Sequence, residues 1–178
     1  MPKTRSRLDR AEKIEEILDA AEARLLGGGY QHMSVAAIAR DLGVAQNSLH
    51  WYFGSKDELF VAVLRRLLQR LAATKPPPRR GLGRQVLWGA DYLHDFAPLR
   101  AAIRERALQS DLVAEFEREL HALLRRVLMH ALEPCVPPSE LDLAATTLMA
   151  TVEGTFVGGL SRPQRHRVIG FALRNLAG

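Results

Sequence analysis

Residues 34–60 read SVAAIARDLGVAQNSLHWYFGSKDELF, and this stretch contains two short helical patterns separated by a turn. In the first pattern, apolar residues recur at helical spacing as far as Leu42, and the glycine that follows permits a tight left-handed turn. Ser34 stands where an N-cap is expected. Ser55 and Glu58 match a capping box at the start of a further helix. The stretch therefore predicts a helix-turn-helix followed by a longer helix.

The second short helix, at about residues 45–52, is predicted to present a polar outer side. Leu49 and Phe53 would pack inward, on the first short helix. Glutamine and asparagine side chains, here Gln46 and Asn47, offer a donor and an acceptor that match an adenine edge in the major groove. The outer side is completed by His50 and Trp51. The alternative is a small helical hairpin whose polar face only contacts solvent.

The composition of the whole chain limits which class of protein it can be. The chain has 178 residues, of which 47% are hydrophobic and 25% charged, as in an ordinary soluble globular protein of one or two domains. Leucine and alanine far outnumber valine, isoleucine and threonine, which favours helix. The single cysteine, Cys135, excludes an internal disulfide and a cysteine-rich zinc site. We expect no secretory signal and no membrane span.

Helical patterns cover most of the remaining chain. A first helix is expected over about residues 8–26, with its end at the three glycines that follow. A fourth helix is expected to run from the capping box to about residue 73. The proline-rich residues 74–84 are predicted to be a connector. Five more helical patterns follow at about residues 83–97, 98–108, 111–132, 139–160 and 162–176, the last with a second capping box at Ser161 and Gln164.

Charge alone does not locate a nucleic-acid site. The net charge of +5 hints at a polyanionic partner. However, residues 11–58, which contain the helix-turn-helix, carry four basic and eight acidic groups. Residues 59–80 carry six basic groups and no acid. A solvated helix face and a charged connector explain that basic stretch adequately, so no membrane surface is expected as a partner.

The residues from Ser34 to Phe60 closely resemble the DNA-binding region of the TetR family of bacterial transcriptional regulators, most specifically from Gly43 to Leu59. The resemblance covers about residues 8–70 and implies an all-α fold. It places a three-helix helix-turn-helix domain at 8–70, with the motif at about 34–53, and a helical ligand-binding and dimerisation domain at 71–178. At three positions, Asn47, His50 and Tyr52, the residue differs from the one that is common in the family. The operator sequence of a relative therefore cannot be assumed for this chain.

The resemblance also implies which residues bind DNA. The expected contacts with double-stranded DNA are Ser34, Val35, Ala45, Gln46, Asn47, Ser48, His50, Trp51, Tyr52 and Lys56. Among them, Ser34 and Lys56 match positions that touch phosphate in the family. Lys3, Arg5 and Arg7 of the N-terminal arm are expected to add phosphate contacts.

The C-terminal half carries a stripe of apolar and small residues at helical spacing, which suits a two-fold dimer interface. The alternative is that the stripe completes the core of a single protomer. The residues assigned to the dimer interface are Leu141, Ala145, Leu148, Val152, Gly154, Phe156, Gly158, Ile169 and Leu173.

An aromatic row at i, i+4 and i+8 suggests an apolar ligand pocket in the same half. Ordinary core packing is the alternative, and it is favoured by spacing alone. The residues assigned to the pocket are Trp88, Tyr92, Phe96, Leu120, Leu124, Met129, Thr147 and Phe156. The small-molecule effector is not identified by these residues, and no cofactor is expected.

Enzyme and metal chemistry find no support in the sequence. There is no glycine-rich phosphate loop and no hydrolase or zinc-protease motif. His121 and His130 lie nine residues apart, a poor spacing for ligands on one helix face. The resemblance implies a cytoplasmic, nucleoid-associated homodimer that represses transcription at an inverted-repeat operator and responds to a small-molecule effector. The rival interpretation is an architectural or cell-cycle DNA-binding protein without an effector.

Overall fold

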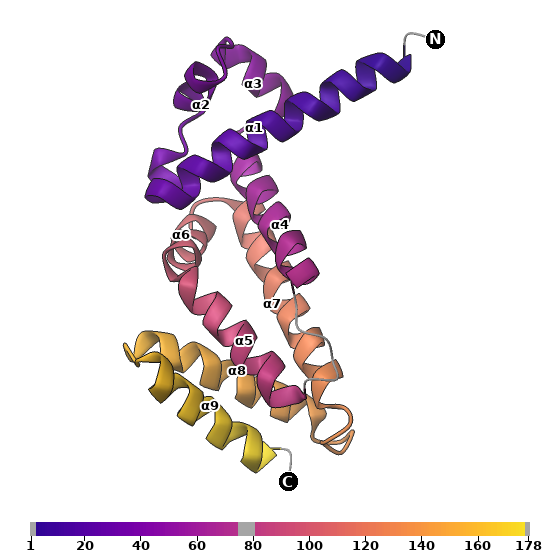
Figure 1. Ribbon diagram of the computed structural model, residues 1–178, viewed down its shortest axis with the longest axis vertical. Helices are drawn as coiled ribbons and strands as arrows, with labels where there is room; N and C mark the ends of the chain where they lie inside the picture. The colour runs from indigo at the N-terminus through magenta and orange to yellow at the C-terminus, as the bar shows by residue number, and fades with distance from the viewer. Residues whose placement is uncertain (1–2, 75–80, 177–178) are drawn as a thin grey trace. The chain divides into compact units, whose positions relative to one another are not determined.

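The computed structural model describes residues 3–74 and 81–176, with side chains from residue 10 onward in the first segment (Figure 1). Every regular element in these segments is a helix, which confirms the all-α prediction. The helices are α1 (Lys3–His32), α2 (Val35–Asp41), α3 (Gln46–Tyr52), α4 (Lys56–Thr74), α5 (Leu82–Asp95), α6 (Ala97–Ala107), α7 (Asp111–Leu132), α8 (Leu141–Val157) and α9 (Arg162–Leu176).

The helices form two compact units. The first contains Met1–Ala73 and Pro98–Phe116, and the second contains Thr74–Ala97 and Glu117–Gly178. Most of α6 and the start of α7 therefore pack with the helix-turn-helix. The functional division predicted at residues 70 and 71 stays a prediction. The side chains of Lys3, Arg5 and Arg7, and residues 75–80 of the predicted connector, lie outside the described residues.

The first helix is longer at both ends than its sequence pattern predicts. It begins at Lys3 and is assigned as far as His32, although the backbone at Gly29 is not helical, with φ 74° and ψ −174°. Only glycine adopts such a backbone without a steric penalty from a Cβ atom. The predicted stop at the glycines is therefore a kink at Gly29, followed by one more turn.

The core of the first unit contains buried side chains of α1, α2, α3 and α4, together with Ile103 of α6 and Val113 and Phe116 of α7. Phe60 and Met33 are completely buried, and Ile38 and Leu49 bring α2 and α3 into the same core. Burial of such side chains is the main stabilising contribution to the unit, at about 1.5–3 kcal/mol for each large one. The helix-turn-helix is therefore held by a buried apolar core.

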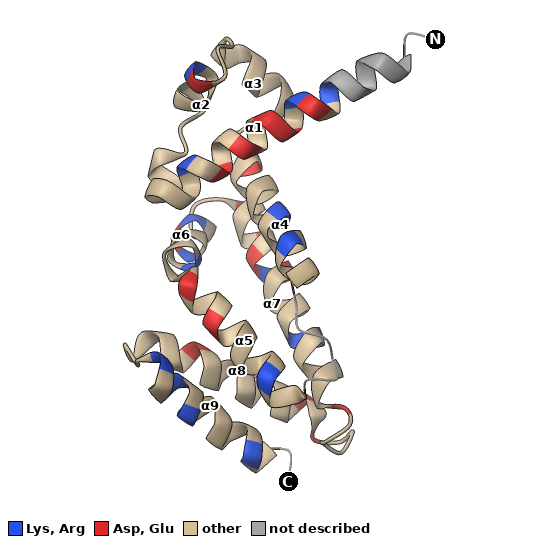
Figure 2. Cartoon of the chain, viewed as in Figure 1, with Lys and Arg blue, Asp and Glu red and all other residues tan. Residues whose placement is uncertain are grey.

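Opposite charges on α1 and α4 neutralise each other in this unit (Figure 2). The Arg66 guanidinium of α4 lies 3.0 Å from Glu15 and 3.1 Å from Glu22, and it also contacts Asp19. Arg70 pairs with Glu22 at 2.5 Å. The acidic and basic blocks of the sequence are therefore partners within the fold, which explains why charge alone does not locate a binding site.

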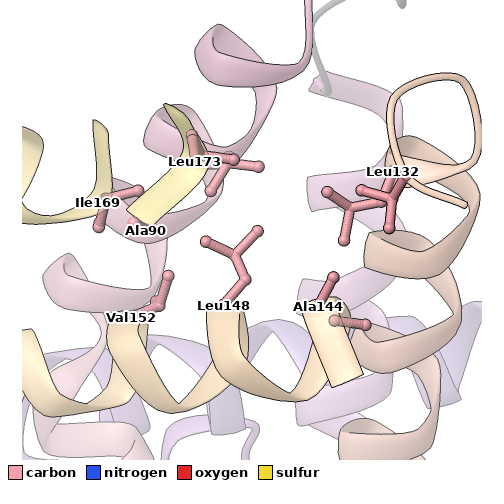
Figure 3. Packing of buried hydrophobic residues seen from close by; sticks show 10 residues of the cluster. Ala90, Leu132, Ala144, Leu148, Val152, Ile169 and Leu173 are labelled. Carbon is pink, nitrogen blue, oxygen red and sulfur yellow. The ribbon is translucent and has the colours of Figure 1, made fainter. Parts of the chain in front are cut away.

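The second unit has a core built from α5, the C-terminal part of α7, α8 and α9 (Figure 3). Leu148 of α8 lies among Ala90 of α5 and Ile169 and Leu173 of α9, and Leu132 closes the α7 end of the cluster. Loss of a buried leucine side chain from such a core costs about 2–5 kcal/mol. This core holds α8 and α9 together as a pair.

The predicted dimer interface needs a correction here. Five of its residues belong to the core of the protomer itself and are at most 8% exposed, so a second chain cannot reach them: Ala145, Leu148, Val152, Ile169 and Leu173. Leu141 and Phe156 pack against the same core. Gly154 and Gly158 are exposed. The apolar face that the sequence period predicts therefore packs inward, in the core of the second unit.

Candidate nucleic-acid interface

The turn between α2 and α3 is formed by backbone hydrogen bonds. The Ser34 side chain accepts a hydrogen bond from the Ala37 amide at 3.4 Å, which confirms the predicted N-cap of α2. After α2, the Val44 amide donates to the Ala39 carbonyl at 3.0 Å, and Gly43 adopts φ 63°. Because the Ser34 hydroxyl acts as an acceptor in the cap, its proton remains available for a phosphate.

The second of the two helices, α3, is anchored by a single buried side chain. Leu49 is 2% exposed and is the one residue of α3 in the core. Gln46 and Asn47 lie in the first turn of α3, and both are exposed. An amphipathic helix so short has little intrinsic stability, and its packing through Leu49 keeps it helical. It therefore presents almost its whole surface to solvent.

The predicted DNA contacts fall into two groups by exposure. Six are exposed, at the start of α3 and along its outer side: Ala45, Gln46, Asn47, Ser48, His50 and Trp51. Four are half-buried at the edges of this surface: Ser34, Val35, Tyr52 and Lys56. All ten belong to the first unit, on α2, α3 and the first turn of α4 or the residues that flank them. Their role as DNA contacts stays a prediction.

Trp51 is the most conspicuous side chain of α3, because its large ring is 66% exposed. The Arg10 guanidinium of α1 lies 4.8 Å from the ring centroid, and Tyr52 meets the ring edge-on at 5.0 Å. A guanidinium stacked on an indole is attracted to its face. Arg10 was not among the predicted contacts, because only the fold brings it to α3.

Lys56 and Asp57, in the first turn of α4, form a polar cluster with Tyr30 and with Arg106 of α6. The Arg106 guanidinium of α6 donates two hydrogen bonds to the Asp57 carboxylate, at 2.7 and 3.1 Å. The Tyr30 hydroxyl donates to the same carboxylate at 2.5 Å. The Lys56 ammonium lies 3.9 Å from the centroid of the Tyr30 ring. Lys56, the predicted phosphate contact, is therefore held by the Tyr30 ring, while Arg106 of α6 binds the adjacent Asp57.

Burial and charge shift the acid–base properties of this cluster. Burial, together with the hydrogen bond to Asp57, raises the pKa of Tyr30 to about 12. Burial works to raise the pKa of Asp57, but hydrogen bonds from Arg106 and Tyr30 outweigh it and hold that pKa below its usual value. Burial and the Arg106 charge lower the pKa of Lys56. Asp57 is therefore ionised at neutral pH, and its carboxylate is hydrogen-bonded to Arg106 and Tyr30.

The second unit has a groove of about 610 Å³ between α5 and α9. Trp88 and Tyr92 line it, and their ring centroids lie 6.0 Å apart. Phe96 continues the aromatic row, 4.6 Å from Tyr92. The other predicted pocket residues do not line this groove. Met129 and Phe156 pack on the core, Leu120 and Leu124 are half-buried on α7, and Thr147 is exposed on α8.

The polar wall of this groove is an ion-pair cluster that the sequence did not reveal. Asp91 of α5 accepts hydrogen bonds from Arg162 at 2.9 Å and from His166 at 2.9 Å, and the buried Arg165 lies 3.4 Å away. Burial works to raise the pKa of Asp91, but the hydrogen bonds from Arg162 and His166 lower it overall. These partners lie more than 70 residues apart in sequence, so no local pattern predicts the cluster.

The model of the bacterial regulatory proteins of the tetR family matches residues 17–63, which contain α2, α3 and their supporting faces. These residues therefore resemble the DNA-binding region of the tetR family. A curated relative, the HTH-type transcriptional repressor KstR of Rhodococcus jostii, is 37% identical over 78 residues. That match covers 43% of this chain and 37% of KstR, so the chain spans well under half of the length of this curated relative.

Solved structures resemble this chain over nearly its whole length. A transcriptional regulator from Rhodococcus sp. has a TM-score of 0.74 at 24% identity, with 93% of this chain and 98% of the other covered. A regulator from Saccharomonospora viridis, solved in complex with choline, has a TM-score of 0.73 at 18% identity. The match covers 92% of this chain and 96% of that regulator. At these identities the likeness shows the fold: a helix-turn-helix followed by helices.

Among residues 3–74 and 81–176, none of the helices combines the length and the apolar character that crossing a bilayer requires. Within the same residues, no group of three or more histidine, cysteine or acidic side chains is placed to hold a metal ion.

Proposed function

We propose that this protein is a sequence-specific DNA-binding regulator that represses transcription as a homodimer on an inverted-repeat operator. The observation that carries the proposal is the exposed α3 on a buried helix-turn-helix core, within the residues that match the family. A helix held in this way enters a major groove, and two copies read half-sites one helical turn apart. Since its target is chromosomal DNA, the protein acts in the cytoplasm, at the nucleoid.

The dimer forms, in this proposal, through the exposed sides of α8 and α9. Val157 of α8 is 86% exposed and Phe171 of α9 is 64% exposed, and Leu143 and Val168 add apolar surface on the same two helices. Exposed Gly154 and Gly158 allow a partner helix to approach closely. Exposed apolar side chains gathered on paired helices are typical of a two-fold interface.

Repression is released, in this proposal, by a small molecule that binds the second unit at the groove beside Trp88 and Tyr92. Aromatic side chains with nearby charged groups are typical of ligand sites, and a groove of about 610 Å³ is of ligand size. The choline-bound regulator from Saccharomonospora viridis supports a ligand-binding role for this fold. The effector must bind one of two conformations more tightly in order to shift their populations.

The decisive experiment is selection of genomic fragments by the purified protein at near-physiological salt, followed by sequencing. We expect enrichment of one or a few inverted repeats beside promoters. Broad retention that is abolished by moderate salt, without a common motif, would contradict the proposal and favour an architectural DNA-binding protein.

Asn47→Ala is expected to weaken discrimination at one base pair of each half-site by about 1–3 kcal/mol, because a bidentate contact to a base edge is lost. Gln46→Ala is expected to do the same at a different base pair. The measurement is competition binding between the selected operator and a set of single-base variants. Gln31→Ala, an exposed glutamine at the end of α1, serves as the control. Uniform weakening on every sequence would show that Asn47 binds phosphate.

A further inference from the structure

Arg106 lies on α6, outside the residues 17–63 that match the family, and its guanidinium is bound to the first turn of α4. We infer that Arg106, Asp57 and Tyr30 are positioning residues that hold Lys56 for a phosphate contact with the operator. This inference rests on the proposed function, in which Lys56 touches DNA. It adds a residue of α6 to the determinants of DNA affinity.

The first step is the fixing of Tyr30 by Asp57. One carboxylate oxygen accepts both the Tyr30 hydroxyl at 2.5 Å and the Arg106 Nε at 3.1 Å, while the other accepts Arg106 Nη2 at 2.7 Å. A bidentate guanidinium–carboxylate pair has a defined geometry as well as strength. Phe60, completely buried, meets the Tyr30 ring edge-on at 4.9 Å. The ring is therefore held at its hydroxyl and at its side.

The second step is the placement of Lys56 on that ring. Its ammonium lies 3.9 Å from the ring centroid, within the range of a cation–π interaction. Lysine has a long, flexible stem, and ordering such a side chain on binding has an entropic cost. Because the Tyr30 face already restricts Lys56 in the free protein, less conformational freedom is lost when a phosphate arrives.

The third step concerns the charge of Asp57. Its carboxylate attracts the neighbouring Lys56 ammonium, and the Arg106 charge opposes that attraction. A carboxylate has about four strong acceptor directions, and here Arg106 and Tyr30 donate three hydrogen bonds while Ser110 donates a further one. Without Arg106, Asp57 is free to pair with Lys56 and to compete with a DNA phosphate for it.

The test is a double-mutant cycle on the full-length protein, with binding to the selected operator measured over a range of salt concentrations. Lys56→Met is expected to reduce the salt slope by about one, as for the loss of one phosphate contact. Arg106→Met is expected to weaken binding and to flatten the slope in the same direction. In the Lys56→Met background, Arg106→Met should then change affinity by less than about twofold, since the two act through one contact.

Arg66→Met provides the matched control, because Arg66 is also a partly buried arginine that bridges helices of the first unit. Arg66→Met should change operator affinity equally in the unmodified and the Lys56→Met backgrounds. It should leave the salt slope of binding unchanged. Circular dichroism melting establishes that each variant is folded. If Arg106→Met fails to fold, Tyr30→Phe, which removes only the hydroxyl, carries the same cycle.

Equal losses from Arg106→Met with and without Lys56 would overturn the inference and assign Arg106 an independent contact or a purely structural role. An unchanged salt slope in Lys56→Met would overturn it as well, because Lys56 would then not touch phosphate. Either result leaves operator binding by the unmodified protein intact. Absence of sequence-specific binding by the unmodified protein would instead contradict the proposed function, and with it this inference.

Discussion

Phe171→Asp is expected to convert the protein from a dimer to a monomer and to weaken binding to an inverted repeat by about 10²–10⁴-fold. The ring of Phe171 is 64% exposed on α9, so the substitution leaves the core of the second unit unchanged. In a dimer interface, however, aspartate would bury an unpaired charge. The two copies of α3 would then bind their half-sites separately. The gain in effective concentration that results from linking them in one dimer would be lost.

Sedimentation velocity measures the oligomeric state, and titration with whole and half operators measures the affinity. A monomer should bind both DNA molecules equally weakly per half-site. Leu108→Asp is the matched control, because Leu108 is an equally apolar and more exposed residue that belongs to the first unit. Val157→Asp probes the α8 side of the same surface. If both Phe171→Asp and Val157→Asp remain dimeric, the interface lies elsewhere.

Phe60→Ala is expected to destabilise the first unit by about 3–5 kcal/mol, the usual cost of a large cavity in a core. Phe60 is completely buried, and its ring contacts Tyr30 edge-on. A loss of this size is a large fraction of the stability of an ordinary domain. Operator binding should fall at temperatures at which the unmodified protein still binds fully.

The two tryptophans of the chain allow this prediction to be read separately in each unit, since Trp51 lies in the first and Trp88 in the second. Urea unfolding of Phe60→Ala is followed by Trp51 fluorescence in a Trp88→Phe background. Phe60→Leu, which retains most of the buried volume, should cost less than about 1.5 kcal/mol. Equal stability of the alanine and leucine variants would show that the site collapses around the missing ring.

Much of the local structure follows from short stretches of sequence. The capping serine of α2 and the glycine turn after it are read directly from residues 34–43. At Ser55, the side chain accepts the Glu58 amide at 3.1 Å, as its capping-box pattern predicts. Gln164 accepts a hydrogen bond from the Ser161 amide at 2.9 Å, as predicted for the start of α9. Each interaction joins residues three apart, so periodicity and side-chain type suffice.

Periodicity shows that a face is apolar, but it does not show which surface covers that face. Leu148 and Ile169 fit a dimer stripe and a protomer core equally well in sequence, and only the packing of α5 on α9 places them in the core. The aromatic residues of α5 and its C-cap contact one another in the order of the chain. The other predicted pocket residues depend on which helices lie opposite, and there the sequence has no local signal.

By itself, the sequence determined the all-helical class, the helix-turn-helix and the exposed polar side of its second helix, because these depend on spacing within a few turns. The tertiary structure decided the pairing of α1 acids with α4 arginines, the inward turn of α8 and α9, and the binding of Arg106 to Asp57. Arg106 and Asp57 lie 49 residues apart. Such contacts depend on how helices pack, and no period in the chain encodes that arrangement.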